Sequence, residues 1–231
     1  MRETNELHQK LWAMHHTKEI KVDIAGVEYS QSEIFACRIY GGVFTKPTIG
    51  TCSSRTLSLK IMPKGTIPRG AKIIVYARLV AGDEVGEWIK QGEFFISLRP
   101  LDKRTGTLDI TAYDAMLKAN AVWLNSTYDE ANWPVTESAA VADIANRMGV
   151  TVDPRTTLGN QYPIDYPVDE NGDMTMWSVL CGIGVSNCGS WVITPDGALR
   201  LLRLSDIGQE THYLVTEAGF AITFGGVKIL V

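Results

Sequence analysis

The stretch from residue 87 to residue 118, EWIKQGEFFISLRPLDKRTGTLDITAYDAMLK, constrains the fold more than any other part of the chain. Apolar residues recur at every second position in residues 94–98 and again in residues 108–112. This period of two is typical of strands that bury one face. The residues between the two runs are rich in turn formers, so we predict an antiparallel hairpin. Asp114 follows the second strand, where its carboxylate can accept backbone N–H bonds as the N-cap of a short helix.

The same pattern extends over most of the first half of the chain. Strands are predicted at residues 20–24, 27–29, 34–40, 55–62, 72–80, 87–98 and 107–113. Clusters of Gly, Pro and Ser at residues 45–54 and 63–70 separate them. Strands with turns at this spacing predict an antiparallel barrel or sandwich.

An amphipathic helix is predicted before the first strand, over residues 4–16. Leu7, Leu11 and Met14 fall at positions i, i+4 and i+7 and form one apolar stripe, with Trp12 beside it. Such a helix can pack on its own domain or dock onto a neighbouring subunit, and the sequence leaves both alternatives open.

Helices dominate the second half. Thr136 is expected to cap a helix that runs to Met148, and Gly149 occupies the position of a left-handed C-terminal residue. Asp173 is expected to cap a second helix, and residues 191–204 contain a strand, a Pro-Asp-Gly turn and another strand. This order predicts a small α+β domain.

The distribution of charge places a domain boundary near residue 120. Residues 20–120 carry 14 Lys and Arg against 10 Asp and Glu, whereas residues 121–231 carry 5 against 13. The basic residues of the first half are dispersed rather than clustered, so we expect no nucleic-acid recognition. No apolar run approaches the ~20 residues that cross a bilayer, so we expect no membrane span. The polar N-terminus does not have the pattern of a signal peptide.

Residues that could bind metal ions do not form a recognisable site in the sequence. The cysteines contain no C-x-x-C pair, and we expect reduced, buried thiols in preference to two disulfides. The histidines are expected to be solvated rather than metal ligands. The cysteines are Cys37, Cys52, Cys181 and Cys188, and the histidines are His8, His15, His16 and His212.

An acidic cluster is the nearest approach to a catalytic or calcium site. It consists of Asp165, Asp169, Glu170 and Asp173, but the position near Leu180, where a calcium loop would end in a Glu, is apolar. A solvated loop is the preferred interpretation. The same acids are the candidates for a glycosidase pair. We predict no catalytic residue, no cofactor site and no metal site, and hence a protein that is not an enzyme.

Aromatic residues are the remaining candidates for contacts. Most lie in strand or helix patterns that predict core packing, but Trp123, Tyr128 and Trp133 lie in or beside a loop. Exposed aromatic side chains at that place would suit a protein–protein interface.

One run of residues resembles a known family. Trp88, Gly92, Phe94 and Ile96 form the pattern W-x-x-x-G-x-F-x-I, which is followed by YDAMLK at residues 113–118. This order resembles the baseplate or tail hub proteins of tailed bacteriophages, prophages and related contractile particles. The resemblance continues through the helical middle to the GSWVITPDGALRLL hairpin and covers most of the chain.

The resemblance implies an α+β, β-rich fold. Its parts are an N-terminal helix (residues 1–17), a tube-like antiparallel β-barrel domain (18–120), a smaller mixed α+β domain (121–218) and the start of a further β segment (219–231). Because further β-structure follows in the family, we expect the last segment to be truncated here.

The resemblance also implies a structural role. We expect self-association into a ring, with a homotrimer as the expected form, that continues the tail tube and contacts baseplate and spike proteins. The expected location is a virion or phage-like particle assembled in the bacterial cytoplasm.

Two alternative functions come from other classes. A carbohydrate- or receptor-binding module of a tail tip would need a cleft lined by exposed aromatic side chains. A cell-wall hydrolase would need two carboxylates in one cleft, for which Asp169 and Asp173 are the candidates.

Overall fold

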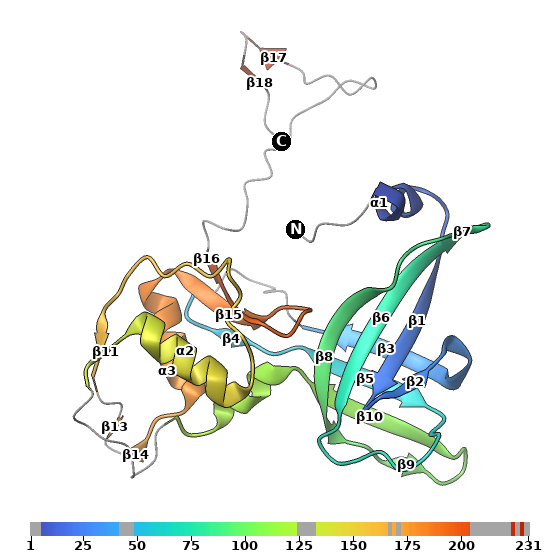
Figure 1. Cartoon of the computed structure of the whole chain (residues 1–231), viewed down its shortest axis with the longest axis horizontal. Helices are drawn as coiled ribbons and strands as arrows, with labels where there is room; N and C mark the ends of the chain where they lie inside the picture. Colours follow the sequence, from blue (N-terminus) through green and yellow to red (C-terminus); the bar gives the residue numbers. More distant parts are fainter. Residues whose placement is uncertain are drawn as a thin grey trace.

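The computed structural model describes residues 6–41, 49–123, 133–165, 168–169, 172–203, 223–224 and 227–228. A large, strongly curved antiparallel sheet lies beside a smaller part that contains two α-helices and a short sheet (Figure 1). The chain is therefore β-rich with a smaller α+β part, as the sequence predicts.

The large sheet contains nine strands in the order β2-β1-β6-β8-β10-β5-β3, with β7 paired to β6 and β9 paired to β10. Their bounds are Thr17–Ile24 (β1), Val27–Tyr29 (β2), Ile34–Tyr40 (β3), Thr56–Ile61 (β5), Lys72–Ala81 (β6), Glu84–Val85 (β7), Ile89–Leu98 (β8), Leu101–Asp102 (β9) and Thr107–Tyr113 (β10). All seven predicted strands are confirmed, and three of them have the predicted bounds.

The core of the large sheet is built from alternate residues of each strand. Along β6, Ile73 and Val75 are buried, and along β8 Phe94 and Ile96 are buried, while the residues between them are partly exposed. Full burial of such a side chain stabilises the fold by about 1.5–3 kcal/mol. The period of two in the sequence is thus the pattern of a sheet with one face in the core.

The predicted closed barrel is not found. The strand β2 pairs with only the last three residues of β1, and the chain then passes through a short 3-10 helix, η1 (Gln31–Glu33), into β3 at the other edge of the sheet. Within the described residues, no backbone pairing joins β1 to β3. The sheet curls back on itself, and an open seam remains between residues 17–21 of β1 and β3.

The N-terminal helix α1 (Glu6–Ala13) uses little of its predicted apolar stripe for packing. Leu11 is fully buried against Leu79 and Ala81 of β6, whereas Leu7 and Met14 are exposed. The burial of Leu11 anchors the helix, and the apolar side chains of Leu7 and Trp12 face outward.

The helix α2 (Glu137–Met148) begins and ends as predicted. The hydroxyl of Thr136 accepts a hydrogen bond from the N–H of Ala139 at 3.2 Å. Gly149 has a φ of 69°, in the left-handed region that glycine adopts without steric cost.

The helix α3 (Met176–Ser186) begins later than predicted. Its N-cap is Thr175, whose hydroxyl accepts from the N–H of Ser178 at 3.2 Å. The prediction that Asp173 caps this helix was wrong, because Asp173 is in a two-residue strand and a hydroxyl two positions later takes the capping role.

The second part contains a three-stranded sheet, in which the hairpin was predicted but the third strand was not. The hairpin of β15 (Gly189–Ile193) and β16 (Leu199–Arg203) is confirmed, but β15 also pairs in parallel with β4 (Cys52–Ser53). The chain therefore leaves the large sheet between β3 and β5, adds one strand to the second part and returns. A short 3-10 helix, η2 (Ala115–Asn120), follows β10 and packs into the second core.

The remaining strands form two-residue pairs. They are β11 (Val135–Thr136) with β12 (Pro163–Ile164), β13 (Val168–Asp169) with β14 (Gly172–Asp173), and β17 (Thr223–Phe224) with β18 (Val227–Lys228). The last pair agrees with the strand pair predicted at the end of the chain.

Two glycines of α3 should respond in opposite ways to substitution by alanine. A Cβ on Gly184 would lie 2.9 Å from the carbonyl oxygen of Gly189 and 3.3 Å from the Cα of Gly50, whereas nothing lies within 4 Å of a Cβ on Gly182. We expect Gly182→Ala to raise the free energy of unfolding by about 0.5–1 kcal/mol. Gly184→Ala should lower it by about 1–3 kcal/mol, because backbone atoms must shift. Urea unfolding of both variants measures this, and equal effects would show that α3 does not pack closely on the loop at Gly50.

Candidate functional site

A hollow in the described structure has a volume of about 980 Å³. It lies where the open seam of the large sheet faces the β15–β16 hairpin, and we call it the seam groove. Ile20 of β1 and Ile39 of β3 belong to its two lips, Val75 and Ala77 of β6 form apolar wall between them, and Val192 belongs to the hairpin side.

Basic side chains outnumber acidic ones around the seam groove. Lys18, Arg55, Arg155 and Arg200 contribute to its lining, and Asp196 is the acidic residue among the lining residues. Whether this charge is available to a ligand depends on which of the four cations already have partners.

Arg55 holds the groove together. Its Nη1 donates to the carbonyl oxygen of Gln91 in β8 at 2.9 Å, and its Nη2 donates to the carbonyl oxygen of Thr194 in the hairpin turn at 3.3 Å. Its Nε lies 3.6 Å from a carboxylate oxygen of Asp114. Arg55 therefore connects the large sheet to the second part.

Asp114 supports Arg55 from a fully buried position, with a side-chain exposure of 0%. Its carboxylate accepts hydrogen bonds from the hydroxyl of Ser54 at 2.9 Å, the N–H of Arg55 at 2.9 Å and the N–H of Met116 at 3.1 Å. Burial raises the pKa of Asp114, and these hydrogen bonds and the Arg55 charge oppose that shift. The predicted N-cap is confirmed, and the same carboxylate also anchors the arginine.

Arg155 is paired with Asp153, whose side chain is only 5% exposed. Its Nε and Nη2 donate to the two carboxylate oxygens of Asp153 at 2.9 and 2.6 Å. These hydrogen bonds lower the pKa of Asp153 to about 2. The charge of Arg155 is therefore largely neutralised.

Lys18 and Arg200 keep their charge available. In the part of the chain that the structure describes, neither side chain has a hydrogen bond or an ion pair, and the Nε of Arg200 is buried without a partner. A buried guanidinium N–H without an acceptor is costly unless a ligand or water completes it. The charge of Arg200 nevertheless acts on the Asp153 carboxylate and helps to lower its pKa. The groove thus combines an apolar wall with two cations that have no hydrogen bond or ion pair among the described residues.

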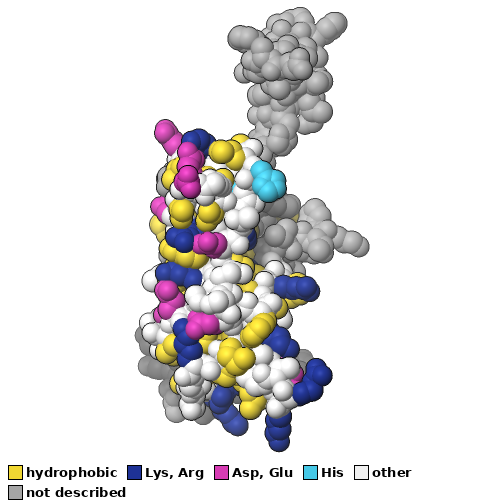
Figure 2. Space-filling model, turned by 90° about the vertical axis from the view of Figure 1, so that its right-hand side faces the viewer, with side chains coloured by type: hydrophobic (Ala, Val, Ile, Leu, Met, Phe, Trp, Pro, Cys, Tyr) yellow, Lys and Arg dark blue, Asp and Glu magenta, His cyan; other side chains and the backbone are white. Residues whose placement is uncertain are grey.

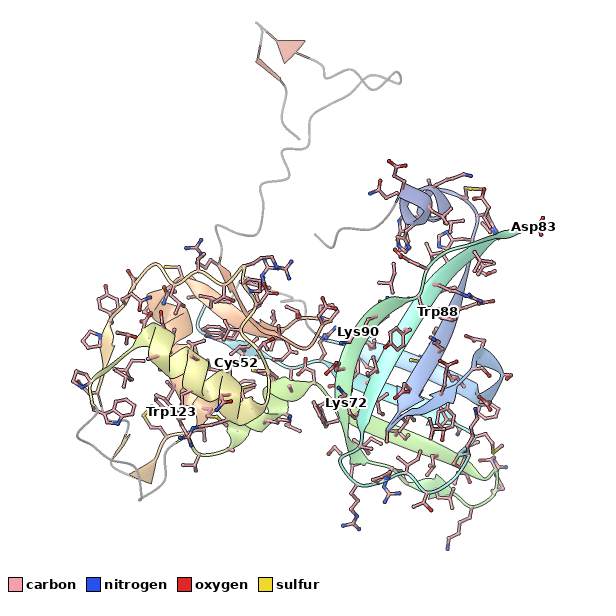
Figure 3. All side chains as sticks on the ribbon, viewed as in Figure 1. Cys52, Lys72, Asp83, Trp88, Lys90 and Trp123 are labelled. Carbon is pink, nitrogen blue, oxygen red and sulfur yellow. The ribbon has the colours of Figure 1, made fainter. Side chains whose placement is uncertain are left out.

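A second group of charges fixes the hairpin turn beside the groove. Lys90 of β8 and Lys72 of β6 lie on the side of the large sheet that faces the second part (Figure 3). The Nζ of Lys90 donates to Glu93 at 2.7 Å and to the carbonyl oxygen of Asp196 at 3.2 Å, and the Nζ of Lys72 lies 3.5 Å from Glu93. This network positions the turn that closes one end of the groove.

The acidic cluster does not form a described site. Asp165 is exposed, and Glu170 and the side chains of Asp169 and Asp173 lie outside the described residues. Among the side chains that are described, no three His, Cys, Asp or Glu residues gather as a metal site.

The histidines of the N-terminal region lie around one exposed indole. The ring of Trp12 stacks on His16 at 5.5 Å and on His8 at 6.3 Å between centroids. His15 is exposed, and His212 lies outside the described residues.

Trp123 and Trp133 pack against each other beside the helix α2. Trp123 is 1% exposed, its Nε1 donates to Asp143 at 2.7 Å, and Trp133 packs edge-on against it at 5.4 Å. Trp123 is a core residue because it covers α2, so it does not meet the condition of exposure that an interface role would require. Tyr128 lies outside the described residues.

The residues of the W-x-x-x-G-x-F-x-I pattern differ in their burial. Gly92, Phe94 and Ile96 are buried in the core, whereas Trp88 lies just before β8 and is partly exposed. The guanidinium of Arg78 lies 4.4 Å from the Trp88 ring and the Nζ of Lys21 lies 5.1 Å from it. Such cation–π contacts hold the indole of Trp88 beside Arg78 and Lys21.

The four cysteines are free thiols, with Cys52 buried, Cys37 and Cys181 partly buried and Cys188 exposed. The prediction of buried thiols therefore fails for Cys188. Burial raises the pKa of the Cys37 thiol to about 11.

No helix in the described residues is long and apolar enough to span a membrane.

Comparison with solved structures finds the same fold in a prophage tail protein. The chain is similar to the 43 kDa tail protein of prophage MuSo2 from Shewanella oneidensis, with a TM-score of 0.56 and 13% identity over 86% of this chain and 59% of that chain. It is also similar to a tail protein from Neisseria meningitidis (TM-score 0.49, 14% identity, 89% of this chain and 53% of that one). A third similar structure is prophage tail protein gp18 from Listeria monocytogenes (TM-score 0.48, 12% identity, 86% and 55%).

The likeness to the MuSo2 tail protein shows a shared fold, and this chain spans 59% of that protein's length. A scan against protein-family models and a search of curated proteins find no match.

Removal of the Asp114 carboxylate should destabilise the protein strongly. Asp114→Ala leaves Arg55 as a buried cation without its anion, which typically costs about 3–5 kcal/mol. Asp109→Ala is the matched control in the same region, because Asp109 is half-exposed and its ion pair with Lys60 spans 3.5 Å. We expect that control to cost less than about 1 kcal/mol. Chemical denaturation compares the two, and a similar small cost for both would contradict the role given to Asp114.

The Asp153–Arg155 pair should make stability depend on pH in acid. The pKa of Asp153 is lower in the folded state, at about 2, than in the unfolded chain, so its contribution is present above about pH 4 and is lost as the pH falls toward 2. Arg155→Gln should therefore reduce the loss of unfolding free energy between pH 4 and pH 2. Arg104→Gln, at an exposed turn, is the control. Parallel pH profiles for both variants and the parent protein would contradict this assignment.

Proposed function

We propose that this protein is a structural subunit of a phage-like tail, at the hub of the baseplate. In this role it forms a ring, with three copies as the expected number, that continues the tail tube and holds baseplate or spike proteins. The observation that carries the proposal is the likeness in fold to a prophage tail protein over 86% of the chain. The order of residues around Trp88 and in residues 113–118 supports it independently.

The surface of the large sheet suits contacts with other proteins. Seen from the side of this sheet, basic, acidic and hydrophobic side chains are interspersed (Figure 2). An interface of mixed character is typical of subunits that fold separately and then assemble. The role proposed is therefore one of assembly, in which no catalytic activity is expected.

Exposed apolar side chains occur at two opposite ends of the large sheet. Figure 1 shows α1 and β7 at one of these ends and β9 at the other. The helix patch is at the end where α1 and β7 lie and consists of Leu7, Trp12, Met14 and Val85. The hairpin patch is at the end where β9 lies and consists of Met62, Leu98 and Leu101. Trp12 is 67% exposed and Leu98 is 62% exposed.

Patches of this kind are what a ring requires. Subunits in a ring contact one another head to tail, so each subunit presents two different surfaces rather than one self-complementary surface. Two separate apolar patches fulfil this condition, and Trp and Leu side chains in the centre of a contact lose the most water on association. We propose that these two patches make the ring contact.

The oligomeric state of the purified chain tests this proposal. Light scattering over a range of concentrations should show one discrete oligomer, with a mass of three chains expected. Trp12→Ser in the helix patch and Leu98→Ser in the hairpin patch should each weaken association at least about tenfold, which corresponds to about 1.4 kcal/mol.

Tyr162→Ser is the control, because Tyr162 is 59% exposed but belongs to neither patch. If Tyr162→Ser weakens association as much as the patch variants do, the patches are not the contact. A chain that remains monomeric at every concentration would contradict the ring and favour a binding module of the tail tip.

A further inference from the structure

The open seam of the large sheet leaves two strand edges facing the same hollow. Lys18 and Ile20 of β1 lie on one lip of the seam groove, and Cys37 and Ile39 of β3 lie on the other. Among the described strands, β3 pairs only with β5, and residues 17–21 of β1 pair only with β6. Each lip therefore presents backbone N–H and C=O groups that no neighbouring strand satisfies.

One contact shows how the seam is partly satisfied. The backbone N–H of Ile20 donates to the side-chain Oε1 of Gln31 at 2.9 Å. A side-chain amide thus takes the place that the carbonyl oxygen of a neighbouring strand would take. Because backbone groups alternate along a strand, the N–H of Lys18 faces the same side as that of Ile20, and a strand laid along β1 would reach both.

We propose that the seam groove accepts an extended, acidic strand from another protein of the tail. The strand would pair with the backbone of β1 or β3. Its alternate apolar side chains would contact Ile20 and Ile39 on the two lips and Val75 in the wall between them. Addition of a strand to an open sheet edge is a general mode of peptide recognition, in which backbone hydrogen bonds supply affinity and side-chain contacts supply selectivity.

The charge of the groove selects the chemistry of the strand. Arg55 and Arg155 are paired with Asp114 and Asp153, while Lys18 and Arg200 form no hydrogen bond or ion pair among the described residues, although the charge of Arg200 also acts on Asp153. A carboxylate on the incoming strand would complete both cations, and the buried Nε of Arg200 would gain the acceptor that it lacks. A basic strand would meet like charge at both positions.

The volume of the groove agrees with a short segment of chain. About 980 Å³ is at the upper end of the range, roughly 300–1,000 Å³, in which proteins bury a ligand. The inserted strand would also close the seam that keeps the sheet from being a barrel.

The naming of a tail protein as the donor rests on the proposed function, but the groove itself does not. Peptide binding is measured on the isolated chain and ring formation is measured by light scattering, so failure of one can be told apart from failure of the other.

Fluorescence anisotropy with labelled peptides tests the proposal. The probe is a capped peptide as long as β3, seven residues, in which glutamate and valine alternate. We expect it to bind, and to bind at least about tenfold more tightly than the corresponding lysine–valine peptide. Replacement of its central valine by proline, which removes an N–H, should weaken binding at least about tenfold.

Substitutions in the groove locate the site. The combined change Lys18→Gln and Arg200→Gln should weaken binding of the acidic peptide about tenfold or more and remove most of its dependence on salt. Arg38→Gln is the matched control, because Arg38 lies on β3 between two groove residues and points to the other face. Ile39→Glu should abolish binding, and thermal unfolding confirms that each variant is folded.

Hydrogen exchange supplies a readout that charge attraction alone would not produce. Bound peptide should slow exchange of backbone amides in residues 17–21 or 34–40 and leave those of β10 unchanged. Absence of binding, equal binding of the basic peptide, or an Arg38→Gln effect equal to that of the double variant would each overturn the proposal. Self-association that the double variant abolishes without any peptide would show that the donor is a second copy of this chain.

Discussion

The buried ion pair of Asp114 and Arg55 is the interaction on which the arrangement of the two parts depends. A carboxylate and a guanidinium lose several kcal/mol each on leaving water, and only a complete set of hydrogen bonds offsets that loss. Here the set is drawn from separate elements: Ser54, η2, the backbone of β8 and the hairpin turn at Thr194. The pair is satisfied only when the large sheet and the β15–β16 hairpin are correctly placed, so it specifies their relative position.

Much of the large sheet could be predicted from the sequence, because alternation is a local property. The positions of β8 and β10 followed from the period of two, and the ends of α2 followed from Thr136 and Gly149. The start of α3 was missed because Asp173 and Thr175 are both good caps, and only tertiary packing decides between them.

The open seam and its groove could not be predicted. Alternating residues look the same in a closed barrel, a sandwich and an open curled sheet, since closure depends on how far two edge strands lie apart. The role of Arg55 was hidden for a related reason: its partners come from residues 91, 114 and 194, and one dispersed arginine has no signature in a sequence. The signal that could have directed attention to Arg55 is its place as the first residue of the predicted strand 55–62, where alternation with Leu57, Leu59 and Ile61 assigns a charged side chain to the buried face.

The parallel pairing of β4 with β15 has a consequence for the order in which this chain can fold during synthesis. Cys52 and Ser53 leave the ribosome long before Trp191 and Val192, the residues with which they pair. The large sheet has all its strands once residue 113 has emerged, while the segment between β3 and β5 still waits for its partner. Sheets built from contacts so distant in sequence form slowly. The second part is thus completed last, on a template that the first part already holds in place.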